Sequence, residues 1–334
     1  MIKFLQLPVE RRVEIIEQAA AKTGLTSNAV EKDWWVTLAL NASFNTKWKG
    51  GLLFKGGTSL SKSWGLIKRF SEDIDLVINR EVLGFKGMLT KSQVSKLRKV
   101  TSKFIATDFL QELQSTLLKM GVDPALFTIV VEKTDLSDRD PQVLELHYTS
   151  LFEPDNYLAE KVLIEIGARS LLEPAEERAI HSIIADTFPT QLYSGNPFMV
   201  MTVNPQRTFL EKLFLLHEEF AKVPEKIRYE RMSRHLYDVE HLMDTEYGKA
   251  ALSNVDLYKL IVRHREHYTP VRGLDYVTLS PSTLSFIPPA TVIELWEVDY
   301  KSMQASMIYG ESLPFAKLME RLNELQSRVR QIPW

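Results

Sequence analysis

The stretch FKGGTSLSKSWGLIKRFSEDIDLVI, residues 54–78, constrains the fold more than any other part of the chain. A short apolar run ends at Gly56 and Gly57, two turns of helix can follow, and DIDLVI then alternates polar and apolar residues as a strand does. On a strand, Asp73 and Asp75 project to one face, and the apolar residues between them face the core. The stretch therefore predicts strand, turn, helix and strand, with two carboxylates on one face.

The paired carboxylates of Asp73 and Asp75 suggest a divalent metal. Two like charges side by side are unfavourable unless a cation lies between them, and Mg²⁺ takes carboxylate oxygens. The alternative is a solvated strand face on which two acids stand by chance. Gly56 and Gly57 favour a ligand, because they allow close backbone approach and a helix beginning at Thr58 would aim free N–H groups at an anion. A phosphate beside a metal is the simplest interpretation, and the GxxxxGK[ST] motif of a P-loop is missing.

The rest of the pattern predicts an α+β fold. Residues 8–44 read as two helices, and residues 91–121 read as one long amphipathic, basic helix. Three β-like runs follow, FTIVVEK, QVLELHYTS and EKVLIEIGA, and the chain turns mainly helical after about residue 200. We expect a mixed sheet flanked by helices, with a mainly helical C-terminal domain.

Three domains are predicted from these patterns. They are an N-terminal helical segment at 1–45 that packs on the core, a catalytic domain at 46–200, and a mainly helical C-terminal domain at 201–334. An irregular, Pro-containing stretch is expected at 269–290.

Composition excludes several classes of site and location. The 334 residues include no cysteine, which rules out disulfide frameworks, thiolate zinc sites and cysteine nucleophiles. No window resembles a signal peptide or a membrane-spanning helix, so we expect a cytoplasmic protein with no membrane partner. A net charge of −2 does not indicate a nucleic-acid binder, although it says little about a local basic patch.

Taken together, GGTSLSK and RFSEDIDLVI resemble the signature of the AbiEii/AbiGii toxin family. This family contains MenT-like nucleotidyltransferases and lies within the DNA polymerase β-like nucleotidyltransferase superfamily. The segments EKDWWVTLAL, FLEKLFLLHE and SRHLYDVEHL also resemble recurring segments of the family, so the resemblance covers most of the chain. It implies that the mixed sheet is of the nucleotidyltransferase type, and that the protein is an NTP-dependent nucleotidyltransferase that uses Mg²⁺ or Mn²⁺.

The resemblance implies roles for five residues. Asp73 and Asp75 would hold two metal ions, as two-metal nucleotidyl transfer requires. A third carboxylate on a neighbouring strand usually completes such a site, and Glu165 in KVLIEIGAR is the candidate; an edge-strand acid facing water is the alternative. Lys212 matches the helical lysine that contacts the triphosphate, and Asp238 matches an aspartate needed for activity.

The predicted nucleotide-binding residues come from the glycine turn and from nearby cations. They are Gly56, Gly57, Thr58, Ser59, Arg69 and Lys212. Lys55, Lys62 and Lys68 add positive charge to the same part of the sequence without an assigned role.

Ser71 is a candidate regulatory phosphosite. It stands two residues before Asp73 and would point to the same side of an extended strand. A phosphate there would bring nearly two negative charges to the metal site and compete for Mg²⁺. The alternative is a turn residue at the start of the strand.

The resemblance also suggests an acceptor and a partner. It implies a toxin of a toxin–antitoxin or phage-defence system that adds nucleotides to RNA, with the 3′ acceptor end of tRNA as the expected target, and so inhibits translation. A separately encoded antitoxin would be its partner. The alternatives are transfer to a protein or small-molecule hydroxyl, and an inactive module that binds nucleotide or RNA.

Two basic segments are candidates for phosphate contacts. One is the helix KSQVSKLRKVTSKF, with Lys91, Lys96, Arg98, Lys99 and Lys103, and the other is IVRHREHY at residues 261–268. Charged runs on helices are commonly just solvated faces.

Overall fold

The computed structural model describes residues 1–134, 139–153 and 159–333. By its internal contacts the chain divides into two compact units. Unit 1 comprises Met1–Trp64 and Phe70–Thr202, and unit 2 comprises Gly65–Arg69 and Val203–Trp334.

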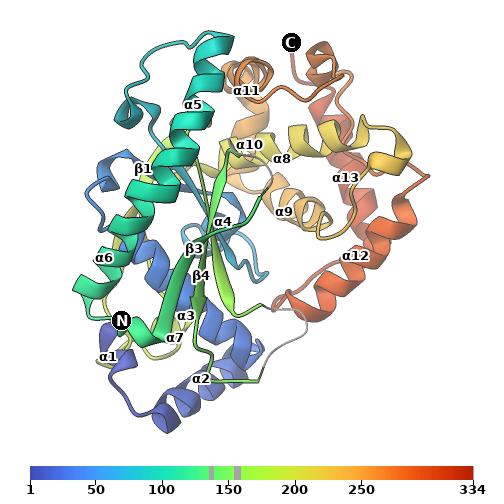
Figure 1. Cartoon of the computed structure of the whole chain (residues 1–334). Helices are drawn as coiled ribbons and strands as arrows, with labels where there is room; N and C mark the ends of the chain where they lie inside the picture. The colour runs from blue at the N-terminus through green and yellow to red at the C-terminus, as the bar shows by residue number, and fades with distance from the viewer. Residues whose placement is uncertain (135–138, 154–158, 334) are drawn as a thin grey trace. The chain divides into compact units, whose positions relative to one another are not determined.

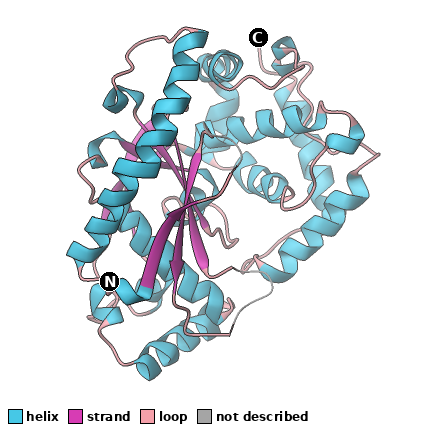
Figure 2. Ribbon diagram, viewed as in Figure 1, coloured by secondary structure: helices cyan, strands magenta, loops and turns pink. Residues whose placement is uncertain are grey.

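Unit 1 is built on a mixed sheet, drawn in magenta in Figure 2. Among the described residues its seven strands are β1 (Leu52–Lys55), β2 (Asp73–Ile78), β3 (Phe127–Val131), β4 (Gln142–Tyr148), β5 (Lys161–Gly167), β6 (Ala175–Ile180) and β7 (Phe198–Val203). They lie in the order β3-β4-β5-β2-β1-β7-β6. β2 is antiparallel to β1 and parallel to β5, which confirms the predicted α+β class with a mixed sheet.

The predicted strands appear as expected, and two further strands were not predicted from the sequence. β6 has the sequence AEERAI, whose charged residues hide any alternation, and it forms one edge of the sheet. β7 has the sequence FMVMTV and lies between β6 and β1. An edge strand needs few apolar residues because one side of it stays in water.

The N-terminal helices form as predicted. α1 (Ile2–Leu5) leads into α2 (Val9–Thr23), which ends at Gly24 in the left-handed conformation. α3 (Ser27–Ser43) begins after Thr26, whose side chain accepts a hydrogen bond from the main-chain N–H of Ala29. α3 packs against β2 and β5, so it forms part of the core of unit 1.

Consecutive charged residues on α3 are buried, and each has a partner. Lys32 forms an ion pair with Glu72, and Nζ of Lys62 lies 2.5 Å from Oδ1 of Asp33. Glu31 accepts hydrogen bonds from the Ser150 side chain and a main-chain N–H. Buried charges without partners are strongly destabilising, so these pairs tie α3 to segments far away in the sequence.

The single helix predicted for 91–121 is interrupted by a π-helical turn. α5 (Lys91–Phe104) runs through the turn Ile105–Phe109 into α6 (Leu110–Met120). Figure 1 shows α5 and α6 running along the sheet of unit 1. Unit 1 also contains α4 (Gly56–Lys62), α7 (Ile183–Thr187) and the short 3₁₀ turns Lys49–Gly51, Arg80–Leu83 and Pro124–Leu126.

Unit 2 is mainly helical, as predicted for the C-terminal part of the chain. Its described helices are α8 (Pro205–Phe220), α9 (Arg234–Met243), α10 (Glu246–Ser253), α11 (Val255–Tyr268), α12 (Ile293–Ser306) and α13 (Phe315–Val329), with 3₁₀ turns at Pro224–Lys226 and Tyr276–Leu279. The stretch 269–290 contains no α-helix, as expected. Within the described parts of the chain, no helix is both long and apolar enough to span a bilayer.

One predicted helix starts later than expected. The helical pattern at 228–245 begins only at Arg234, because the carboxylate of Asp299 accepts hydrogen bonds from the main-chain N–H groups of Arg231 and Ser233. Arg231 has a positive φ of 58°, which ends any helical path before it.

The segment Gly65–Arg69 belongs to unit 2 although its neighbours in the chain belong to unit 1. The main-chain N–H of Lys68 donates to the hydroxyl of Tyr237, and the carbonyl of Lys68 accepts from the main-chain N–H of Tyr309. This segment therefore brings Arg69 into unit 2.

Candidate active site

The two aspartates of β2 lie on one face of the strand. Asp73 and Asp75 are half-buried, and they alternate with Ile74 and Leu76, which are buried. This is the arrangement predicted from DIDLVI.

Asp75 stands in a row of charged residues that crosses three strands. On one side it is opposite Lys55 of β1, and on the other it is opposite Glu165 of β5. Directly paired residues share a face of the sheet, with strands about 4.8 Å apart. β5 is paired on both sides, with β2 and β4, so the alternative of Glu165 as an edge-strand acid is wrong.

Crowding of negative charge affects Glu165. Burial is the largest cause that raises its pKa, and the charges of Asp75 and then Asp73 raise it further, to about 7. Lys55 acts in the opposite direction. The three acids thus form a negatively charged patch in which a proton or a metal ion is favoured.

Gly56 lies directly against Asp75. A Cβ atom added to Gly56 would stand 1.9 Å from Oδ2 of Asp75, and Gly56 has a φ of +77°. Any side chain at this position would clash with the carboxylate and strain the backbone. α4 begins at Gly56 rather than at Thr58 as predicted. The glycine turn and the acidic strand are therefore in direct contact.

The hydroxyl groups after the glycine turn face inward. The side chains of Thr58 and Ser59 are fully buried. Oγ1 of Thr58 lies 2.8 Å from Oγ of Ser71 and also hydrogen-bonds the main-chain carbonyl of Asp73, while Oγ of Ser59 donates to the carbonyl of Gly56. In this structure these hydroxyls hold the turn against β2, and their contact with a nucleotide stays a prediction, as does that of Gly57.

Lys62 has a structural role that the sequence did not reveal. Its ammonium group pairs with Asp33 and also donates to the hydroxyl of Thr37, at 2.8 Å. Asp33 in turn accepts from the main-chain N–H of Ile183. The helical pattern of EKDWWVTLAL gives no signal for this, because the partner lies 29 residues away.

Three other predicted residues meet in unit 2. Arg69 holds the carboxylate of Asp238 with two hydrogen bonds, from Nε at 2.7 Å and from a terminal nitrogen at 2.8 Å. Nζ of Lys212, on α8, lies 2.8 Å from the same carboxylate. The side chains are 2%, 0% and 8% exposed for Arg69, Asp238 and Lys212. This buried cluster carries one more positive charge than negative.

The electrostatics of the cluster follow from this arrangement. Burial acts to raise the pKa of Asp238, but the charges of Arg69 and Lys212 outweigh it and hold the pKa below its usual value. Burial lowers the pKa of Lys212, against the attraction of Asp238. His235, whose Nδ1 lies 3.3 Å from Nζ of Lys212, has a pKa lowered by burial and then by Lys212, so it is held neutral.

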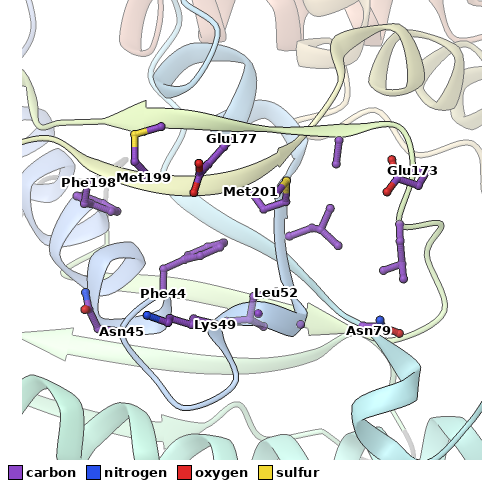
Figure 3. A pocket seen from close by; sticks show the side chains of 15 residues that line it. Phe44, Asn45, Lys49, Leu52, Asn79, Glu173, Glu177, Phe198, Met199 and Met201 are labelled. Carbon is purple, nitrogen blue, oxygen red and sulfur yellow. The ribbon is translucent and has the colours of Figure 1, made fainter.

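A cavity of about 650 Å³ lies at the other ends of β1 and β2 (Figure 3). Figure 3 shows Phe44, Met199 and Met201 among its lining side chains, together with Lys49 and Glu177. None of the predicted site residues lines it. It is separate from the acidic row.

The acidic row offers carboxylate oxygens to a metal ion. Across the described residues, no group of three or more His, Cys, Asp or Glu side chains is arranged to enclose a metal. The donors nevertheless suit Mg²⁺, which binds through one or two carboxylates together with water and substrate phosphates. The mutual repulsion that raises the pKa of Glu165 also favours a cation there.

A family model and known structures resemble this chain. The model described as "Nucleotidyl transferase AbiEii toxin, Type IV TA system" matches residues 39–323. No curated protein matches the chain in sequence.

Three solved structures are similar to the chain at low sequence identity. MenT4, a nucleotidyltransferase toxin from Mycobacterium tuberculosis H37Rv, is 19% identical, with a TM-score of 0.52, covering 95% of this chain and 90% of its own. JHP933 from Helicobacter pylori is 18% identical, with a TM-score of 0.36, covering 90% of this chain and 99% of its own. A structure titled putative nucleotidyltransferase from H. pylori is 15% identical, with a TM-score of 0.43, covering 92% and 96%. At such identity the likeness to MenT4 shows a shared fold.

Proposed function

This chain belongs to the AbiEii family of nucleotidyltransferase toxins of type IV toxin–antitoxin systems, and from that premise we propose that it transfers nucleotides from an NTP to RNA. The proposed acceptor is the 3′ end of tRNA, and its modification would inhibit translation in the cytoplasm. A separately encoded antitoxin would counter this activity.

The observation that carries the proposal is the contact of Asp75 with Gly56 inside the acidic row. Nucleotidyl transfer joins the oxygen of an acceptor hydroxyl to the α-phosphorus of the NTP, breaks the bond to pyrophosphate and releases the hydroxyl proton. Such a reaction needs carboxylates that hold divalent metal next to a turn that admits phosphate. Asp73 and Asp75 would hold Mg²⁺ or Mn²⁺, with Glu165 as a third ligand. When bound, two such ions would neutralise phosphate charge and activate the attacking hydroxyl.

The glycine turn would bind the phosphates. Gly56 and Gly57 carry no side chain, so main-chain N–H groups of the turn are open to an anion. Thr58 and Ser59 would keep this turn in place through their buried hydrogen bonds.

Lys212 and Arg69 would supply positive charge for the triphosphate. Their cluster with Asp238 has an excess positive charge, and a buried excess charge is stabilised by an anion. Asp238 would orient both cations.

The experiment that tests the proposal is a labelling assay. Purified protein is incubated with Mg²⁺, deproteinised total RNA and each α-labelled NTP in turn, and the products are separated on a denaturing gel. We expect label in a tRNA-sized band with one NTP, no label after chelation of the metal, and none with Asp75→Asn. Glu177→Gln removes an exposed acid outside the row and serves as the matched control.

Other outcomes would contradict the proposal. If protein or a small molecule is labelled, and this labelling survives treatment of the acceptor mixture with RNase, the acceptor is a hydroxyl group outside RNA. Absence of any NTP turnover, with binding of nucleotide or RNA retained, would identify an inactive binding module.

A further inference from the structure

α5 differs in charge from other exposed helices of this protein. Its sequence, KSQVSKLRKVTSKF, contains five basic residues and no acid. On α13, by contrast, Lys317 pairs with Glu320, and Arg321 and Arg328 both pair with Glu324. Solvated helix faces are commonly laced with such pairs, so α5 is an exception.

Three of its lysines form a single stripe. Lys96, Lys99 and Lys103 are exposed and follow one another at spacings of three and four residues, which places them on one side of the helix. The opposite side carries the buried residues Val94 and Leu97. The lysine stripe (Lys96, Lys99 and Lys103) spans roughly 10 Å along the axis.

The lysine stripe has no acidic partner among the residues that the structure describes. Within the described parts of the chain, Lys96, Lys99 and Lys103 form no ion pair. Like charges at these spacings on a helix are mildly destabilising, and the stripe occurs in a chain whose net charge is −2. Its charge is therefore concentrated locally and available to an anionic partner.

A hollow with an aromatic residue adjoins the lysine stripe. A cavity of about 330 Å³ is lined by Leu83, Gly84, Phe85, Lys86, Leu89, Gln93, Lys96 and Val100. Its lining residues thus include two lysines, Lys86 and Lys96, and one aromatic residue, Phe85. Cations for phosphates with an aromatic surface for a base are the usual elements of a single-strand RNA site.

α5 is anchored to the sheet that carries the acidic row. The buried hydroxyl of Ser102 donates to Oε1 of Gln142, the first residue of β4, at 2.9 Å. Gln142 is paired with Ile166, the residue that follows Glu165 in β5, so this anchor lies on the face of the sheet opposite to the acids. A polymer held along α5 would therefore reach the acids by passing around the sheet of unit 1.

The other basic segment does not offer a comparable surface. Arg265 holds the carboxylate of Glu218, with Nε 2.8 Å from Oε1, and Tyr268 is buried. Of Arg263, Arg265 and Tyr268, which could contact phosphate in this segment, only Arg263 is exposed. Of the two predicted surfaces, α5 is the one with several unneutralised cations.

We propose that the lysine stripe and the adjoining hollow bind the backbone and an unstacked base of the RNA acceptor. The inference rests on the proposed function, which supplies RNA as the partner. What it adds is the surface of unit 1 that holds the RNA. The positive charge of the stripe favours a polyanion as the partner. Phe85, which lines the hollow, favours RNA rather than an anionic membrane, because an aromatic residue can stack on a base.

The test measures RNA binding without catalysis. Full-length protein is titrated with a labelled RNA hairpin that has a single-stranded 3′ end, without NTP, over a series of salt concentrations. The triple variant Lys96→Gln/Lys99→Gln/Lys103→Gln is compared with Lys119→Gln/Lys249→Gln/Lys301→Gln, which removes the same charge from exposed positions on other helices. Three lost phosphate contacts should make the slope of log K against log salt shallower by about 2, and the control should keep the wild-type slope.

Each result separates this proposal from the proposed function. Equal slopes for the two triple variants would overturn the RNA surface, even if the wild type still labels RNA. A shallower slope for the stripe variant alone would support it, even if no NTP were turned over. If the stripe binds phosphatidylserine vesicles but not RNA, its partner is an anionic membrane surface, and the proposal is wrong.

Discussion

Oδ2 of Asp75 lies so close to Gly56 that a methyl group on the glycine would stand 1.9 Å from it. The position of a predicted metal ligand is therefore fixed by a residue without a side chain. Because Asp75 also stands between Lys55 and Glu165, a shift of its carboxylate would disturb the whole row.

Gly56→Ala is expected to lower nucleotidyl transfer by roughly a hundredfold, because it displaces the Asp75 carboxylate. It should also cost about 1–2 kcal/mol of stability, because the glycine has a positive φ. Gly24→Ala is the matched control, with a φ of +75° and nothing within 4 Å of the added Cβ. It should lose similar stability and keep its activity. Equal activity of the two variants would show that the close contact is unimportant.

The stability of the metal-free protein should depend on the protonation of Glu165. Its pKa is raised by burial, Asp75 and Asp73 from 4.5 to about 7, so the folded protein holds this proton more tightly than the unfolded chain. The stabilisation that this proton gives to the folded state is complete below pH 4.5 and is lost as pH rises through about 7. Allowing for solvent around the half-buried carboxyl, the loss is on the order of 1–2 kcal/mol.

Melting temperatures across this pH range provide the measurement. In the presence of chelator, Glu165→Gln should remove the decline between pH 4.5 and about 7, because its amide does not titrate. Added Mg²⁺ should raise the melting temperature more at pH 8 than at pH 6, since metal and proton compete for the carboxylate. An unchanged decline in the variant would assign the pH dependence to other groups.

Asp238 and Lys212 should differ in their effects on folding. Asp238→Asn leaves Arg69 and Lys212 buried without their counter-charge and should cost about 3–5 kcal/mol. Lys212→Met leaves the pair of Arg69 with Asp238 intact, so its stability should change little while turnover falls. Urea unfolding and the labelling assay report the two effects. Full turnover in Lys212→Met would remove Lys212 from the nucleotide site.

Ser71→Glu should abolish most of the activity. The Ser71 hydroxyl lies 2.8 Å from Oγ1 of Thr58, which also bonds the carbonyl of Asp73, so a negative charge there adds to the repulsion in the acidic row. Ser71→Ala should stay active, and Ser302→Glu, at an exposed position on α12, should behave as wild type. Full activity of Ser71→Glu would count against regulation by phosphorylation.

Local patterns in the sequence were sufficient for much of the fold and for half of the candidate site. The alternation in DIDLVI identifies β2 and the shared face of Asp73 and Asp75, because a strand repeats every two residues. The caps at Thr26 and Gly24 likewise locate two helix ends through single residues. Such signals need no knowledge of the rest of the chain.

The remainder depends on contacts between distant segments. The position of Lys55 opposite Asp75 is a matter of strand register, and Glu165 joins the row only because β5 lies beside β2. Glu165 was found through family resemblance rather than periodicity. The pairing of Arg69 with Asp238 spans 169 residues and leaves no local trace.

Because Gly65–Arg69 belongs to unit 2, part of this unit is synthesised long before the rest of it during translation. At a ribosomal rate of 5–20 residues per second, Arg69 is synthesised roughly ten to thirty seconds before Asp238, since 169 residues separate them. During that interval the cluster of Arg69, Lys212 and Asp238 does not exist. A nascent chain that ends after unit 1 thus carries Arg69 without Lys212 and Asp238, so the proposed triphosphate contacts of this cluster form only after the C-terminal helices have been translated.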